Sequence, residues 1–135
     1  MNKKPLDVYT ANDWEFLAQP KLEGQWFERK AHISIQTATN LKGFRQQIAR
    51  GICGFANSNP DIGGLFVIGV GNDGTLHGID GLGLDYENTI LSYNELLDGP
   101  IPQHKLVEFT KANGDVDHLI FIYAPFIKGV ARTTD

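Results

Sequence analysis

One short apolar run constrains the fold more than any other feature of the sequence. Residues 65–70, Leu-Phe-Val-Ile-Gly-Val, place apolar side chains on both sides of an extended chain. A strand of this kind must be covered on both faces, so it predicts a central strand between two layers. Glycines at 63–64 precede it, and a Gly-Asn-Asp-Gly turn signal at 71–74 follows, so we expect a β-hairpin with residues 75–79.

The clearest helix of the sequence lies at residues 39–57. Its apolar side chains recur at the three- and four-residue spacing of one buried helix face, and they are Leu41, Phe44, Ile48, Ile52 and Phe55. Two shorter helices are predicted, one at residues 10–17 with Thr10 as its N-cap and one at residues 85–97.

Three further strands complete the predicted architecture. They lie at residues 25–31, 104–111 and 118–124, and Asn113-Gly114 predicts a tight hairpin between the last two. The fold class is therefore α/β (α+β), with a mixed sheet of about five to six strands and two or three helices packed on it. We expect one domain over residues 1–135, with residues 1–19 as an N-terminal helical extension, cut from a longer protein after residue 135.

The composition excludes several classes of protein. With 135 residues, 41% of them hydrophobic and 21% charged, the chain suits one packed core and does not suit a disordered, collagen-like or coiled-coil protein. The sequence contains no apolar run near the ~20 residues that cross a bilayer, and no signal peptide. A single cysteine, Cys53, fits a reducing compartment. We therefore expect a cytoplasmic protein with no membrane partner.

The triplet Glu28-Arg29-Lys30 is the most informative candidate site. Residues two apart on a strand point to the same face, so Glu28 and Lys30 should project together. A carboxylate beside an ammonium suits metal-assisted phosphodiester chemistry, in which the carboxylate holds a cation and the lysine stabilises phosphate charge. Glu23 lies at an odd offset from Glu28 and joins it only if Gly24 permits a bulge. The spacing fits equally an ordinary exposed ion pair on a surface strand.

Basic residues gather in the first half of the chain despite a net charge of −4. A local positive face would attract phosphates, although the overall charge opposes non-specific binding to nucleic acid. Trp26 falls on the same predicted strand face as Glu28, where it could stack on a base or be buried in the core. The candidate phosphate contacts are Lys21, Arg29, Lys30, Arg45 and Arg50.

Other catalytic motifs are missing from the sequence. No phosphate-binding loop of the Gly-x-x-x-x-Gly-Lys type is found, and Gly69-x-Gly71 leads into a turn rather than a helix. The four histidines lack the close spacing of zinc ligands, and Cys53 has apolar neighbours that indicate burial rather than reactivity.

Three segments taken together resemble one known family. They are Glu23-x-x-x-x-Glu28-x-Lys30, the helix end Ile52–Ser58, and the run Gly63–Val70 with Asp73-Gly74 and Gly78-Ile79 after it. They are similar to the motifs of the Schlafen-type, AlbA-like nucleic-acid-binding domains over roughly residues 20–130. Arg29 departs from the family pattern, which usually has phenylalanine there. The resemblance implies an α/β DNA-binding domain of bacterial transcriptional-regulator-like proteins, and older family labels add ATP binding.

Nuclease members of that family use a third acid shortly after the strand at residues 65–70. The corresponding position in this chain is Asn72 or Gly71, neither of which is acidic, and Asp73 is adjacent. An asparagine can bind a metal through its carbonyl oxygen but lacks the charge that activates a bound water. This departure weakens the expectation of cleavage more than the expectation of binding.

Three functional hypotheses follow from the sequence. The first is a DNA- or RNA-binding module without cofactor, using the basic residues named above. The second is an endonuclease in which Glu23, Glu28 and Asp73 hold Mg²⁺ or Mn²⁺ and Lys30 assists. The third is a protein-interaction or dimerisation domain that forms a homodimer. ATP is a cofactor by family label only.

Overall fold

The structure is a computed structural model, and a mixed β-sheet forms its centre. The described residues are 3–22, 26–31, 38–58, 62–82, 93, 97–98, 102–125 and 132–133. The strand order is β1 (Phe27–Lys30), β2 (Gly64–Ile68), β5 (Val116–Ala124), β4 (Gln103–Thr110). β1 and β2 run parallel, and the other two pairs are antiparallel. The predicted α+β class is confirmed, although the main sheet contains four strands rather than five or six.

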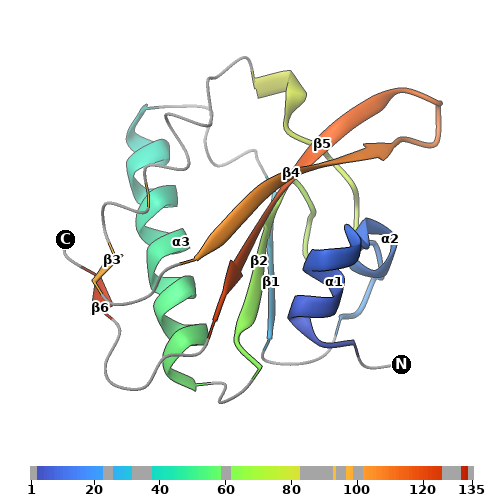
Figure 1. Ribbon diagram of the computed structural model, residues 1–135. Coiled ribbons are helices and arrows are strands. Elements are labelled where there is room, and N and C mark those ends of the chain that lie inside the picture. The colour runs from blue at the N-terminus through green and yellow to red at the C-terminus, as the bar shows by residue number, and fades with distance from the viewer. Residues whose placement is uncertain are drawn as a thin grey trace.

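Helices cover both faces of this sheet. The long helix α3 (Ala38–Ser58) lies on one face, and the short helices α1 (Pro5–Ala11) and α2 (Trp14–Leu17) lie on the other (Figure 1). A separate two-stranded sheet joins β3 (Leu97–Asp98) to β6 (Arg132–Thr133). Within the described part of the chain, no helix has both the length and the apolar character required to cross a membrane.

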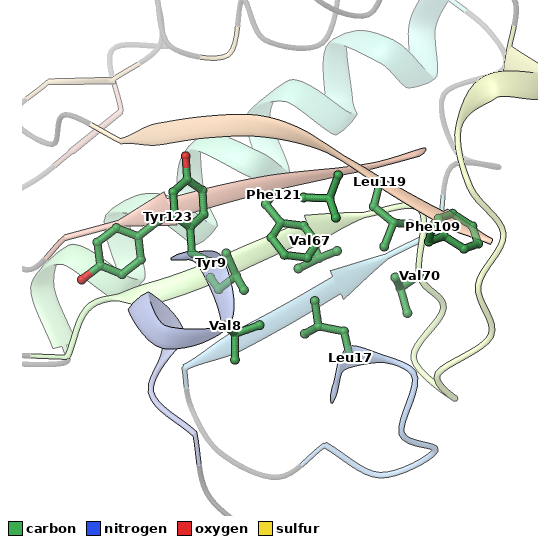
Figure 2. Close-up of a cluster of buried hydrophobic side chains, with 11 residues drawn as sticks. Val8, Tyr9, Leu17, Val67, Val70, Phe109, Leu119, Phe121 and Tyr123 are labelled. Carbon is green, nitrogen blue, oxygen red and sulfur yellow. The ribbon is translucent and has the colours of Figure 1, made fainter. Parts of the chain in front are cut away.

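β2 is buried along its whole length, which confirms the central strand that the apolar run predicts. Phe66 and Ile68 join a cluster with Ile48 and Ile52 of α3. Leu65 and Val67 point the other way, into a second cluster with side chains from α1, α2, β4 and β5. Figure 2 shows this second cluster. The two faces of β2 therefore contribute side chains to both layers of the core.

The N-terminal segment contains two helices where one was predicted. α1 begins at Pro5 and ends at Ala11, and its C-cap Asn12 adopts the left-handed conformation with φ 52°. Asp13 then caps α2, because its side chain accepts a hydrogen bond from the Phe16 backbone N–H at 3.2 Å. Thr10 lies inside α1, so its prediction as an N-cap was wrong; the aspartate three residues later satisfies the free N–H instead.

The predicted hairpin after β2 is reduced to a turn. Only one bridge, Val70 to Leu76, joins the two segments. Gly69 has φ +107° and Gly78 has φ +74°, and these backbone conformations interrupt regular pairing. The backbone N–H groups of His77 and Gly78 both donate to the Gly69 carbonyl instead. Residues 75–79 are therefore not a strand, and the glycines are the physical reason.

The remaining predictions can be compared element by element. α3 confirms the helix at 39–57, and the β4–β5 hairpin turns at Gly114, whose φ is +92°. The predicted helix at 85–97 falls mostly outside the described residues, and Leu97, its last residue, is in a strand. Tyr93, from the same segment, is completely buried.

A buried carboxylate fixes the turn at residues 78–80 to β5. Asp117 is 4% exposed and accepts hydrogen bonds from the backbone N–H groups of Ile79, Asp80 and His118. Its other oxygen lies 2.9 Å from the Lys111 ammonium. A Cβ at Gly78 would lie 2.1 Å from the Asp117 Cγ, so only glycine allows this approach. Burial raises the pKa of Asp117, but the hydrogen bonds from Lys111 and the three amides outweigh it and lower the pKa to about 2.

Replacing Asp117 by asparagine should remove a pH-dependent part of the stability. A lowered folded pKa means that the ionised form stabilises the fold above the unfolded value near 3.9, and this stabilisation is lost as pH falls toward 2. The Asp117→Asn protein should be about 2 kcal/mol less stable than the wild type at pH 6, and the gap should close near pH 2. Urea denaturation across this pH range measures the gap, with exposed Asp7→Asn as control. A constant gap would contradict the assignment.

Candidate nucleic-acid interface

Glu28 and Lys30 lie side by side at the edge of the sheet. The Lys30 Nζ is 3.3 Å from the Glu28 Oε1, and their side chains are 35% and 44% exposed respectively. Glu28 pairs in register with Phe66, and Lys30 pairs with Ile68. The Phe66 and Ile68 side chains point toward α3. The two-residue repeat of the strand therefore places a carboxylate and an ammonium together, within reach of solvent, on the α3 face.

The pair lies at the carboxyl end of two parallel strands. Lys30 is the last residue of β1, and its carbonyl accepts a hydrogen bond from the Gly69 backbone N–H at 2.8 Å. α3 begins at Ala38 and connects β1 to the parallel strand β2. In open α/β sheets, ligands bind outside the carboxyl ends of the strands. Lys30 occupies that end of β1, and Glu28 precedes it by two residues on the same face.

Arg29 points to the opposite face and is buried. Its guanidinium donates to the carbonyls of Leu17 at 3.0 Å, Gln19 at 2.6 Å and Asn72 at 2.6 Å. Burial lowers the pKa of Arg29, and the nearby Asp73 carboxylate opposes that shift. Because only 8% of the residue is exposed and its donors are committed to backbone carbonyls, Arg29 is a structural residue. The structure gives it no surface on which to meet a phosphate.

Asp73 belongs to the turn that Arg29 holds. Its carboxylate accepts from the Thr75 backbone N–H at 3.0 Å, and hydrogen bonds from the Thr75 backbone and hydroxyl lower the pKa of Asp73. Gly74 of the same turn packs closely on the carbonyls of Ala18 and Gln19. Glu28 points to the α3 face of the sheet, whereas the turn that contains Asp73 is bound to Arg29 and packed on residues 18–19.

The third-acid position of the nuclease pattern holds no carboxylate. Gly71 is buried, and a Cβ there would lie 3.0 Å from the Asp73 Oδ1 and 3.2 Å from the His77 Nε2. Asn72 is exposed, and its carbonyl is bound by Arg29. Glu23, the remaining acid of the predicted metal set, lies outside the described residues.

The other predicted basic residues occupy different surfaces. Lys21 is exposed and lies shortly before β1. Arg45 is partly buried and shares the helical stripe of Ile48 and Ile52, which faces the sheet. Arg50 is exposed and is two residues from Ile48, on the side of α3 turned away from the sheet. Arg45 thus lies on the side of α3 that faces the sheet, and Lys30 lies on the side of the sheet that faces α3. Arg50 lies on the opposite side of α3.

Trp26 precedes Glu28 by two residues and is partly buried. Its carbonyl accepts a hydrogen bond from the Leu65 backbone N–H at 2.7 Å, which extends the β1–β2 pairing by one residue. Its intermediate burial leaves stacking on a base compatible with the structure.

Sequence spacing does not reveal a second polar group, formed by Asp80, Asp117 and His118. Their ligand atoms lie within 4.8 Å of one another, and the His118 Nδ1 is 2.9 Å from an Asp80 oxygen. The Asp117 oxygens, however, already accept from three backbone amides and from Lys111. A cation there would displace these donors and meet the Lys111 charge, so this group is best described as a structural cluster.

A surface hollow of about 490 Å³ lies away from Glu28 and Lys30. It is lined by Ala18, Gly74, Leu76 and residues 110–113. Lys111, the charged residue of this lining, is paired with buried Asp117. The hollow therefore offers little charge to a phosphate, and the candidate interface remains the edge of β1.

Arg29→Ala should destabilise the fold by about 2–4 kcal/mol, because it removes a buried donor that satisfies three carbonyls. Arg29→Lys should also be destabilising, since one ammonium cannot reproduce the planar fork of the guanidinium. Urea denaturation measures the loss, and exposed Lys21→Ala should change stability by less than about 0.5 kcal/mol. An Arg29→Ala protein as stable as the wild type would refute the structural role.

Comparison with models of protein families gives a match that covers most of the chain. The family model described as Schlafen, AlbA_2 matches residues 23–125, which include β1, α3, β2, β4 and β5. No curated protein matches the sequence. The matched segment contains the Glu28–Lys30 pair, and it begins after α1 and α2. The chain belongs to the Schlafen AlbA_2 family.

Proposed function

We propose that this chain is a nucleic-acid-binding module, with DNA as the favoured ligand, that contacts phosphates through Lys30. The observation that carries the proposal is the position of the Glu28–Lys30 pair, which is solvent-reachable at the carboxyl end of β1. The family match supports the same function, because the pair lies within the matched segment and resembles the end of the family's acidic signature.

The Lys30 ammonium is available to an incoming phosphate. Its contact with Glu28 is 3.3 Å long and exposed, and such surface ion pairs contribute only about 0–1 kcal/mol. A phosphate oxygen can therefore compete for the ammonium at small cost. Exposed Lys21, shortly before the strand, and Arg45, on the sheet side of α3, are the candidate secondary contacts.

Binding of this kind should be weak and sensitive to salt. The net charge of −4 repels a polyanion at long range, so attraction must come from the local group of cations. Phosphate contacts release condensed counterions, and this release makes affinity fall as salt rises. The proposal accordingly predicts contact with the backbone more than recognition of base sequence.

The geometry favours binding over cleavage. Metal-assisted hydrolysis needs several acids around one cation, but Asp73 lies in a turn that is bound to Arg29 and packed on residues 18–19. Glu28 is the acid found beside Lys30 among the described residues, and a single carboxylate holds Mg²⁺ weakly. We therefore favour binding, and Glu23, the third acid of the nuclease hypothesis, lies outside the described residues.

Lys30→Ala should weaken binding to duplex and single-stranded oligonucleotides several-fold and reduce the slope of log affinity against log salt by about 1. Fluorescence anisotropy between about 50 and 300 mM NaCl measures both quantities. The matched control is Lys4→Ala, which removes one exposed charge at the start of α1 and should change the affinity less.

Two results would overturn this assignment. One is a wild-type protein that binds no DNA or RNA at about 50 mM salt, where counterion release favours complex formation most. The other is an equal loss of affinity in the Lys30→Ala and Lys4→Ala proteins, because the effect would then come from net charge rather than from the edge of β1.

The substitution Glu28→Gln distinguishes a binding module from a metal-dependent nuclease. In a binding module, the substitution removes a negative charge beside Lys30 and should strengthen nucleic-acid binding in EDTA several-fold. In a metal-dependent nuclease, it should instead abolish cleavage with Mg²⁺ or Mn²⁺. The measurements are anisotropy in EDTA and gel assays of labelled RNA and DNA with metal. Weaker binding by Glu28→Gln in EDTA would contradict the proposed role of Lys30.

A further inference from the structure

The β4 strand has one unpaired side. β4 pairs with β5 over all eight residues from Gln103 to Thr110, and it ends the main sheet. No other described strand lies along its outer side. Figure 1 shows β4 and β5 running out from the sheet together as a long hairpin. An exposed edge of this length offers a row of backbone donors and acceptors to another strand.

The hydrogen-bond pattern fixes which backbone groups point outward. At the hairpin end, the Lys111 N–H donates to the Asp115 carbonyl at 2.8 Å, so Lys111 faces β5. The direction alternates along a strand, and Val107 and Phe109 therefore face β5 as well. The outward groups belong to the even-numbered residues, which are His104, Leu106, Glu108 and Thr110.

These outward groups form a self-complementary set about Leu106. A second β4 running antiparallel places Leu106 opposite its own copy, with each N–H donating to the other's carbonyl. The same register places His104 of each copy opposite Glu108 of the other. Their side chains share the sheet face of Leu106, which is itself 40% exposed. In this register Leu106 of one copy contacts Leu106 of the other. On either side of that contact, His104 of one copy faces the Glu108 carboxylate of the other.

We propose that two copies of this chain associate by antiparallel pairing of their β4 edges about Leu106. Pro102 has no N–H to donate, so pairing is confined to about residues 104–108. Lys105 does not place its charge in the seam, since its Nζ lies 4.2 Å from the centre of the Tyr9 ring on the opposite face. A seam of five residues is small, so the dimer should be weak, with micromolar affinity.

The dimer leaves the proposed nucleic-acid interface accessible. β1 and β4 are at opposite edges of the main sheet, so pairing through β4 places the two β1 strands at the far ends of one continuous sheet. Each Glu28–Lys30 pair stays on an outer edge. Two such sites on one particle would strengthen binding to a long nucleic acid through effective concentration.

Leu106→Lys tests the pairing, because it places two ammonium groups directly opposite each other at the symmetry axis. Sedimentation velocity from about 5 to about 500 µM should show a monomer–dimer equilibrium for the wild type and a monomer throughout for Leu106→Lys. The matched control is Val116→Lys, an equivalent change at a 52% exposed position of β5, and it should dimerise as the wild type does. Circular dichroism checks that both variants are folded.

Charge exchange and amide exchange test the register. His104→Glu should weaken the dimer by facing Glu108 of the other copy, and the double variant His104→Glu with Glu108→Lys should restore it. Hydrogen exchange of the His104, Leu106 and Glu108 amides should slow as protein concentration rises, whereas the Val107 amide, already bonded to β5, should not change. A wild type that stays monomeric at 500 µM, or amides that exchange independently of concentration, would overturn the proposal, and nucleic-acid binding by the monomer is measured separately.

Discussion

The buried Arg29 guanidinium joins β1 to the N-terminal segment and to the turn after β2. It binds the carbonyl of Leu17 at the end of α2, that of Gln19 just beyond it, and that of Asn72 in the turn after β2. A buried cation must be satisfied, so this contact holds the N-terminal segment and the turn against β1. Since side chains alternate along a strand, anchoring Arg29 on one face also directs Glu28 and Lys30 to the other face.

Sequence patterns predict the parts of this fold that depend on local chemistry. The apolar run of β2, the helical spacing of α3 and the Asn113-Gly114 turn all lead to the observed elements. Patterns fail where a tertiary contact decides. The turn at residues 71–79 follows left-handed glycines and the buried Asp117 carboxylate, neither of which has a local signal.

The candidate site was predictable to the same extent. The proximity of Glu28 and Lys30 follows from strand periodicity, and the identical periodicity already places Arg29 on the reverse face. Its partners could not be predicted, because they are backbone carbonyls 10 to 43 residues away in sequence. The position of Asp73 depends on that contact, so the sequence alone could not place Asp73 relative to Glu28. The two edges of the main sheet thus differ, since the charged pair lies on β1 and β4 has one side that pairs with no described strand.

The position of α1 and α2 has a consequence for where a fragment of this domain should begin. The family match starts at residue 23, yet Val8, Tyr9 and Leu17 fill one face of the sheet, and Leu17 and Gln19 accept two of the Arg29 bonds. Two of the three carbonyls that accept hydrogen bonds from Arg29 therefore lie before the matched segment. A fragment that starts at residue 23 would expose an apolar face of the sheet. It would also leave the Arg29 guanidinium without two of its hydrogen-bond acceptors. A fragment made for expression should therefore include α1 and α2, which form one layer of the core.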